Sequence, residues 1–400
     1  MLATARQLGA VALRAGGAMN ARERFLACMR FETVDHALDW EMGYWAGALD
    51  RWHAEGLPRR SDEPTGLQPG EGVKGEGFPW RRSEPRDTAV HAALGLDEGL
   101  EKVDVNWGPC PAFRVCVLSE DETTVTRREA DGSVVRLRKD SASLPHAVAW
   151  PVSDWASWEQ FREERLQPDA PGRLPAAWED HLALYRRRDW PLLIGGPFVG
   201  VFSALRSLMG FEAMMYAFYD SPDLMRAILA HLTELWLALF EQVLGQVEVD
   251  GMYYWEDMSY KGGGMVSPRV FQAFLAPVYR RINGFLRERG VDVILLDTDG
   301  NVWDLIPQLL DVGVTGLYPF EVRAGMDVAD VRARYPRLQM LGGIDKTALA
   351  AGPDAIDAEL ARIAPVIGTG GYVPACDHYV PPDVSWGNFS YYRRRLRDLL

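Results

Sequence analysis

The chain has little cysteine, little lysine and a shortage of positive charge. Its 400 residues include four cysteines, and none of them forms a CxxC pair. This usage suits a reducing compartment and excludes a disulfide framework. Aspartate and glutamate outnumber lysine and arginine by 56 to 43, so the formal net charge is −13. That balance argues against nucleic acid or an anionic membrane as the main partner.

The sequence also has no uninterrupted apolar run near the ~20 residues that a membrane-spanning helix needs. Residues 1–18 carry Arg6 and Arg14 but no clear signal-peptide core. We therefore expect a cytoplasmic protein, with residues 1–18 as a tail. Residues 19–400 are expected to form one domain.

Short apolar runs alternate with helical stretches from Trp190 onward, and polar residues follow each run. Such alternation is typical of βα units around a buried parallel sheet. When these units close into a barrel, the active site forms at the carboxyl ends of the strands. The sequence thus predicts an α/β fold, a (β/α)8 TIM barrel with N-terminal helices. The expected strands occupy residues 191–194, 250–254, 293–296, 314–318, 338–341 and 371–374.

An insertion is expected at about residues 57–188. Asp131-Gly132, between alternating runs within residues 113–139, predicts a β-hairpin there. A helix is expected from Trp155 to Arg165. Further on, Ser221-Pro222 should divide the long helical region 211–246, and Ser267-Pro268 should open another helix.

Asp297 and Asp299 form the sharpest candidate site. Alternate residues of a strand share a face, so both carboxylates would point the same way. Like charges so placed need a metal, an arginine or a shared proton. The alternative is that Asp299 or Asn301 caps a helix beginning near Val302.

Three more candidates follow other expected strands. His378 suits a metal ligand or an acid–base group, and its alternative is a loop histidine bonded to backbone. Glu256 and Glu321 follow aromatic residues, where partial desolvation would raise their pKa values. Their alternative is a salt bridge with Lys261 or Lys346. We interpret Glu256, Asp297, Glu321 and His378 as catalytic.

Aromatic residues near the expected mouth are candidates for substrate contact. Tyr44, Trp45 and Trp52 have helical spacing, which favours core packing but also suits the wall of a pocket. We predict a substrate-binding set consisting of Tyr44, Trp45, Trp255, Tyr318 and Lys346.

Three segments together resemble the uroporphyrinogen decarboxylase superfamily: residues 20–30, Gly342–Lys346, and His378 with Pro381-Pro382-Asp383. This superfamily includes haem-pathway decarboxylases and cobalamin-linked methyltransferases. The decarboxylases carry an N-terminal arginine pair for the substrate carboxylates. Here the segment after Asp35 reads Leu38 to Tyr44 without an arginine. The resemblance therefore argues against uroporphyrinogen as the substrate.

The resemblance to the zinc methyltransferase branch implies a ligand set. Asp297, Asp299 and His378 stand where that branch has histidine and two cysteines. With Glu256, they would hold zinc or another divalent metal. The implied activity moves a methyl group from a small O- or N-methyl donor to a corrinoid-binding protein that supplies the corrinoid. The alternatives are a decarboxylase of a porphyrinogen or another small acid, and a non-catalytic binding protein. The chain is expected to be a monomer or a homodimer.

Overall fold

The structure is a computed structural model that describes residues 18–59, 85–139 and 146–400. The tail expected at residues 1–18 lies outside the described residues except for Ala18.

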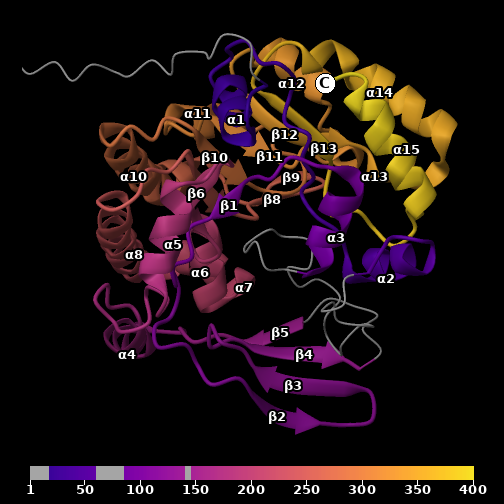
Figure 1. Cartoon of the computed structure of the whole chain (residues 1–400). Coiled ribbons are helices and arrows are strands. Elements are labelled where there is room, and N and C mark those ends of the chain that lie inside the picture. Colours follow the sequence, from indigo (N-terminus) through magenta and orange to yellow (C-terminus); the bar gives the residue numbers. More distant parts are fainter. Residues whose placement is uncertain (1–17, 60–84, 140–145) are drawn as a thin grey trace, which may run out of the picture.

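A curled parallel sheet of seven strands forms the centre of the molecule (Figure 1). Its order is β1-β6-β7-β10-β11-β12-β13, so each strand pairs with the next one along the barrel. This confirms the predicted TIM-barrel fold. The strands are β1 (Glu101–Lys102), β6 (Leu192–Gly196), β7 (Gly251–Trp255), β10 (Ile294–Asp297), β11 (Gly316–Tyr318), β12 (Gln339–Ile344) and β13 (Tyr372–Cys376).

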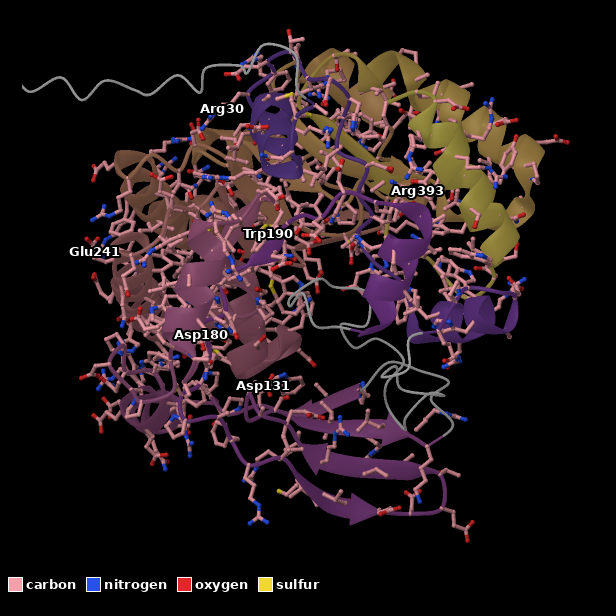
Figure 2. All side chains as sticks on the ribbon, viewed as in Figure 1. Arg30, Asp131, Asp180, Trp190, Glu241 and Arg393 are labelled. Carbon is pink, nitrogen blue, oxygen red and sulfur yellow. The ribbon has the colours of Figure 1, made fainter. Side chains whose placement is uncertain are left out.

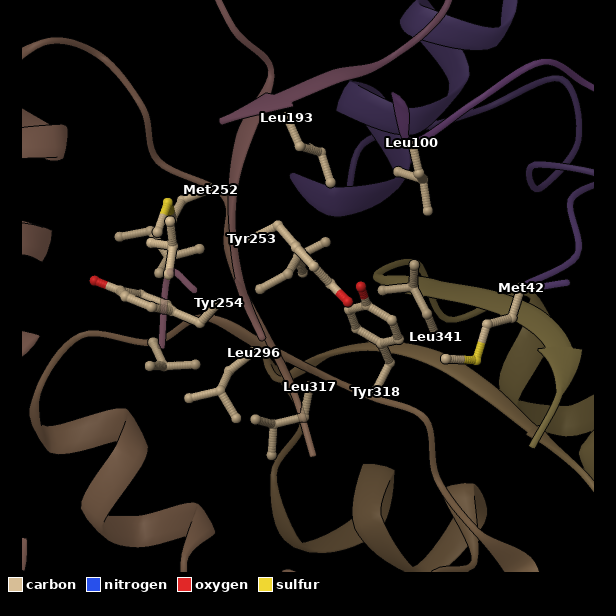
Figure 3. Packing of buried hydrophobic residues seen from close by; sticks show 14 of the residues in the cluster. Met42, Leu100, Leu193, Met252, Tyr253, Tyr254, Leu296, Leu317, Tyr318 and Leu341 are labelled. Atoms are coloured by element: carbon tan, nitrogen blue, oxygen red, sulfur yellow. The ribbon is translucent and has the colours of Figure 1, made fainter. Parts of the chain in front are cut away.

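Both faces of this sheet are buried, which explains the continuous apolar runs in the sequence. Strand β7 illustrates the alternation of its side chains. Met252 and Tyr254 point to one side of the strand, and Tyr253 points to the other, where it meets Tyr318 (Figure 3). The rings of Tyr253 and Tyr318 lie 5.5 Å apart between centroids. Polar groups at the strand ends thus sit on a packed interior.

Helices surround the sheet, and the expected boundaries are confirmed. Helix α4 begins at Trp155, α7 and α8 are separated at Ser221, and Ser267 caps α9 by accepting a bond from the Val270 N–H. The helices are α1 (Ala21–Met29), α2 (Ala46–Ala54), α3 (Pro85–Leu94), α4 (Trp155–Arg165), α5 (Trp178–Arg186), α6 (Val201–Met209), α7 (Phe211–Asp220), α8 (Pro222–Leu244), α9 (Pro268–Val270), α10 (Ala276–Glu288), α11 (Ile306–Asp311), α12 (Val328–Arg334), α13 (Lys346–Ala351), α14 (Pro353–Ile367) and α15 (Trp386–Arg397), with short turns η1 (Phe271–Leu275) and η2 (Val322–Ala324).

Helix α8 corrects the expectation that no segment has the length and apolarity of a membrane span. Its 23 residues pass that test by length and composition, with a mean hydropathy of 1.4. Half of this stretch is buried inside the protein. The apolar character of α8 is therefore explained by packing on the barrel, since core helices pass the same test.

A second, antiparallel sheet lies beside the barrel (Figure 1). It has the order β2-β3-β4-β5, with β2 (Cys116–Glu120), β3 (Thr124–Arg128), β4 (Val134–Arg138) and β5 (His146–Ala149). The expected hairpin is β3–β4, whose turn is fixed by Asp131 Oδ1 accepting the Ser133 N–H at 2.9 Å. A small ribbon of β8 (Ser259–Tyr260) and β9 (Gly263–Gly264) lies near the mouth. Residues 57–188, expected as an insertion, contribute this sheet and also strand β1 of the barrel.

The edge of the barrel next to β13 is covered by residues 37–45. The Trp45 N–H donates to the Val380 carbonyl at 3.1 Å, and Glu41 accepts the Cys376 N–H at 2.9 Å. Arg393 of α15, which is labelled in Figure 2, has 1% of its side chain exposed. It bonds Glu41 at 3.1 Å and also pairs with Asp39. This buried cation joins the two ends of the domain.

Replacing Arg393 tests that contact. Arg393→Met should lower the free energy of unfolding by about 3–5 kcal/mol, because the buried Glu41 would lose its cation and Asp39 would be left with Arg397. Urea unfolding followed by tryptophan fluorescence measures the loss. Arg394→Met, at an exposed position of the same helix, should change stability by less than about 0.5 kcal/mol. Equal effects of the two variants would contradict the role of Arg393.

Candidate active site

A cavity of about 370 Å³ opens where the strands end. Asp299 follows β10, Glu321 follows β11, Lys346 follows β12 and His378 follows β13, so four strand ends converge on it. Its lining consists of Trp45, Asp299, Glu321, Lys346, Thr347, His378, Pro381 and Asp383. The structure thus brings together five of the residues singled out from the sequence: Trp45, Asp299, Glu321, Lys346 and His378.

Asp299 and His378 face each other in this cavity. Asp299 Oδ2 lies 3.7 Å from His378 Nε2, while the buried Oδ1 has no hydrogen-bond partner among the described residues. Burial, followed by the charges of Asp257 and Glu321, raises the pKa of Asp299 to about 7. Burial and then Lys346 lower the pKa of His378 to about 4. Near neutral pH the imidazole is uncharged, and Asp299 holds a proton in a large share of molecules.

The helix-cap alternative for this segment is wrong for Asp299. The next helix, α11, begins only at Ile306, and no described N–H donates to the Asp299 carboxylate. Asn301 instead fixes the turn that follows, because its Oδ1 accepts the Trp303 N–H at 3.2 Å. The carboxyl group of Asp299 is therefore left facing the cavity.

Lys346 is held by two carboxylates at the rim. Its Nζ lies 3.2 Å from Glu321 Oε1 and 3.4 Å from Asp377 Oδ1. Burial lowers the pKa of Lys346, but Asp377 and Glu321 outweigh that effect and the pKa is raised. Glu321 also accepts the Gly300 N–H at 2.9 Å. The salt-bridge alternative predicted for Glu321 is thus the observed arrangement.

Asp377 belongs to this rim although sequence reasoning did not select it. It is fully buried and accepts the N–H groups of Lys346 and Val322, each at 3.1 Å. Burial raises its pKa to about 6 against the effect of Lys346. The available signal was its position between Cys376 and His378 at a strand end.

Trp45 walls the cavity, whereas Tyr44 does not. The Trp45 ring lies 6.2 Å from the His378 ring with 26° between their planes. Tyr44 is 1% exposed and packs on Trp52 and Phe389, at 5.2 and 5.5 Å between ring centroids. The predicted substrate contact by Tyr44 is therefore wrong: consecutive residues of this extended segment point in opposite directions, and its side chain lies in the core.

Asp297 lies in the barrel interior rather than on the cavity wall. It is 6% exposed, and its Oδ2 accepts the Tyr253 hydroxyl at 2.6 Å. Burial and then Asp299 raise its pKa. Tyr318 packs against Tyr253 in the same interior. Neither Asp297 nor Tyr318 is among the residues that line the cavity.

Lys102 of β1 is a buried cation in this interior that the sequence did not reveal. Its Nζ lies 4.3 Å from the centre of the Tyr253 ring. Burial lowers its pKa to about 7, against the opposing effect of Asp297. It was missed because residues 101–102 are glutamate and lysine, which form no apolar run that would mark a barrel strand.

Glu256 is a structural residue, which corrects its assignment as catalytic and metal-binding. Its carboxylate accepts the N–H groups of Val201, Phe202 and Ser203 at the start of α6, and the Tyr279 hydroxyl as well. The side chain is fully buried, and burial raises its pKa to about 7 against these donors. Both oxygens serve the helix N-terminus. Trp255 beside it is half-buried against the core and is not part of the cavity lining.

The predicted metal set is not assembled. Among the described residues, no three His, Cys, Asp or Glu side chains are placed to hold one ion. Glu256 is engaged by α6 and Asp297 by Tyr253, which leaves Asp299 and His378 as a pair. Two donors fall short of the three or four protein ligands that zinc takes. The residues present do not fit a resident zinc ion.

Comparison with known proteins identifies the family. The family model for uroporphyrinogen decarboxylase (URO-D) matches residues 128–398, and the chain belongs to this family. Uroporphyrinogen decarboxylase of Pseudomonas aeruginosa LESB58 is 31% identical over 172 residues, or 42% of this chain and 46% of the relative. That of Azotobacter vinelandii is 32% identical over 174 residues, with the same coverage. The chain thus matches slightly less than half the length of these relatives.

A solved structure described as a methyltransferase from Methanosarcina mazei resembles the whole fold. It aligns with a TM-score of 0.59 at 18% identity, covering 95% of this chain and 98% of that one. The likeness supports the barrel architecture. The family resemblance expected from the sequence is therefore confirmed, and the choice of reaction rests on the residues of the cavity.

Replacing Asp299 tests its raised pKa. A carboxyl whose pKa rises on folding stabilises the protein at low pH and loses that contribution as pH rises through its folded pKa, here about 7. Asp299→Asn stays uncharged, so it should raise the melting temperature more at pH 8 than at pH 5. Differential scanning calorimetry at the two pH values measures the difference.

Asp121→Asn is the control, because the pKa of Asp121 is shifted in the opposite direction. Hydrogen bonds from Thr124 and Thr123 lower the pKa of Asp121, so it is ionised at both pH values. Its replacement should cost stability equally at pH 5 and pH 8. A pH-independent shift for Asp299→Asn would contradict the raised pKa.

Proposed function

We propose that this protein is a methyltransferase that moves a methyl group from a small O- or N-methyl donor to a corrinoid-binding protein, with Asp299 as general acid. The observation that carries the proposal is the Asp299–His378 pair: a carboxyl that keeps its proton near pH 7, with one oxygen free of hydrogen bonds at the cavity. A general acid works best when its pKa lies near the working pH. We further propose that the enzyme is cytoplasmic.

The chemistry requires a proton at the leaving atom. The oxygen of a methyl ether leaves poorly as an alkoxide, so protonation lowers the barrier. The reduced corrinoid of the partner supplies the electron pair that bonds to the methyl carbon, while the C–O electron pair goes to oxygen. That oxygen takes the proton of Asp299 and leaves as a hydroxyl group. His378, whose Nε2 lies 3.7 Å from Asp299 Oδ2, is proposed to relay the proton that restores the acid.

The charges of the cavity favour a donor without carboxylates. Among the described lining residues, Lys346 is the one permanently cationic side chain, and Glu321 and Asp377 already neutralise it. No arginine of the described segments is part of the lining. Trp45 offers an apolar wall for the rest of the donor. An uncharged or cationic methyl compound fits this cavity better than a polycarboxylate.

The second candidate is a decarboxylase of a small carboxylic acid. The names of the curated relatives favour it. It would require Lys346 to leave Glu321 or Asp377 and bind the substrate carboxylate. The methyltransferase therefore requires Asp299 as a proton donor, whereas the decarboxylase requires Lys346 as a ligand for the substrate carboxylate.

Activity of Asp299→Asn tests the first candidate. With 2-methoxyphenol as donor and free cob(I)alamin as acceptor, the variant should lose about 10²–10⁴-fold in rate, the usual contribution of a general acid. The wild-type rate should fall as pH rises through about 7, because the proton leaves Asp299. Absorbance of the methylated corrinoid measures both. Asp304→Asn, exposed in the same segment, should keep the wild-type rate and pH profile.

Uroporphyrinogen discriminates between the candidates. We expect no measurable decarboxylation, because the described residues give the cavity no arginine for the substrate carboxylates and its lysine is already paired. Product analysis by chromatography checks this. Turnover that Lys346→Met abolishes and Asp299→Asn leaves intact would establish the decarboxylase instead.

A further inference from the structure

One face of the antiparallel sheet β2–β5 concentrates positive charge in an acidic protein. Thr126 pairs with Arg136, and Arg136 pairs with His146, so these side chains share a face of the sheet. Arg128 and Arg138 lie on the same face, two residues along β3 and β4. We call this the basic face; it comprises Arg128, Arg136, Arg138 and His146, all exposed.

In the part of the chain that the structure describes, cationic side chains on the opposite face and at the edge of the sheet form ion pairs, whereas Arg128 and Arg136 of the basic face do not. Arg127 pairs with Glu129 at 2.5 Å, and Lys139 pairs with Glu120 at 2.8 Å. The ion pairs of this sheet within the described residues involve neither Arg128 nor Arg136. Like charges that lie close on one sheet face repel each other. The basic face therefore gains from contact with an anionic surface outside the chain.

The net charge of the chain indicates which kind of anionic partner fits the basic face. The net charge of −13 disfavours a long polyanion or a membrane, because either would also lie against acidic parts of the protein. A compact protein domain contacts the sheet alone, and at physiological salt the remaining charge is screened beyond roughly 8 Å. Arginine is also suited to bidentate contact with carboxylates.

We propose that the basic face is a docking surface for the acidic face of a partner protein, bound through Arg128 and Arg136. This inference rests on the function proposed above: the partner is the protein that carries the corrinoid. Docking through a separate sheet leaves the cavity residues free for the methyl donor. The sheet then serves association with the acceptor, and the barrel serves chemistry.

The experiment uses the full chain and a labelled hexaglutamate peptide as a short acidic probe. Binding is measured by fluorescence anisotropy at roughly 0.05 M and roughly 0.5 M salt. The wild type should bind at low salt and weaken at high salt. Arg128→Glu/Arg136→Glu should weaken binding at least about tenfold, since charge-assisted hydrogen bonds are among the stronger polar contacts.

A matched control reverses the same charge elsewhere. Arg187→Glu/Arg394→Glu changes two exposed arginines outside the sheet and should weaken binding less than about twofold. Arg128→Gln/Arg136→Gln, a milder change, should fall between the wild type and the charge reversal. Circular dichroism confirms that each variant is folded.

The outcomes separate this proposal from the proposed function. Absence of wild-type binding at low salt, or equal losses in the two reversal variants, would overturn the docking surface. Tighter binding of single-stranded DNA or of phosphatidylserine vesicles through the same arginines would overturn the choice of a protein partner. Methyl transfer to free cob(I)alamin needs no docking and should be unchanged in Arg128→Glu/Arg136→Glu. If the wild type shows no methyl transfer, the enzyme assignment is contradicted, but the binding result is unaffected.

Discussion

The contact between the two ends of the domain holds the segment that supplies one wall of the cavity. Arg393 of α15 neutralises Glu41, and Glu41 in turn accepts the N–H of Cys376 at the end of β13. The same segment continues to Trp45, whose N–H bonds the Val380 carbonyl. Trp45 is thereby set beside His378. A buried ion pair is weak evidence for stability in itself, but separating its partners leaves an unpaired buried charge, which is costly. The contact therefore holds residues 37–45 in one position beside β13.

Carboxylates at the rim outnumber the cations available to them. Lys346 is committed to Glu321 and Asp377, which leaves Asp299 without a cation in contact. Burial next to further negative charge then favours the protonated form of Asp299. His378 stays uncharged for a different reason: burial and then the positive charge of Lys346 lower its pKa, and the neighbouring carboxylates do not offset them. A neutral acid beside a neutral imidazole follows from these two effects and suits proton donation to a leaving group.

The fold could be predicted because its signals are local and repeated. Apolar runs followed by polar residues marked the six barrel strands β6, β7, β10, β11, β12 and β13, and Ser-Pro pairs marked the helix starts at α8 and α9. The site could be predicted only in part. Asp299, Glu321 and His378 reach the cavity because they directly follow strands. Glu256 also follows a strand, but its role depends on α6, some 55 residues earlier in the chain, which no local pattern reveals.

The other residues whose positions the sequence did not predict, Tyr44 and Lys102, also depend on contacts between distant segments. Tyr44 and Trp45 are neighbours of similar chemistry. Only the bridge between Tyr44 and Val380, which the Trp45 N–H helps to close, decides which of them faces the cavity. Lys102 was hidden because β1 has two residues and gains its barrel position by pairing with β6. Each of these roles is set by contacts between distant segments. Sequence patterns resolve such contacts only through resemblance to a family.

The central claim is that Asp299 holds its proton near neutral pH. Infrared difference spectra of wild type minus Asp299→Asn isolate the carbonyl stretch of this carboxyl from the other buried acids. The account predicts a protonated-carboxyl band at pH 5 that loses half its intensity near pH 7. A spectrum without that band at pH 5, with the carboxylate bands already complete, would contradict the account.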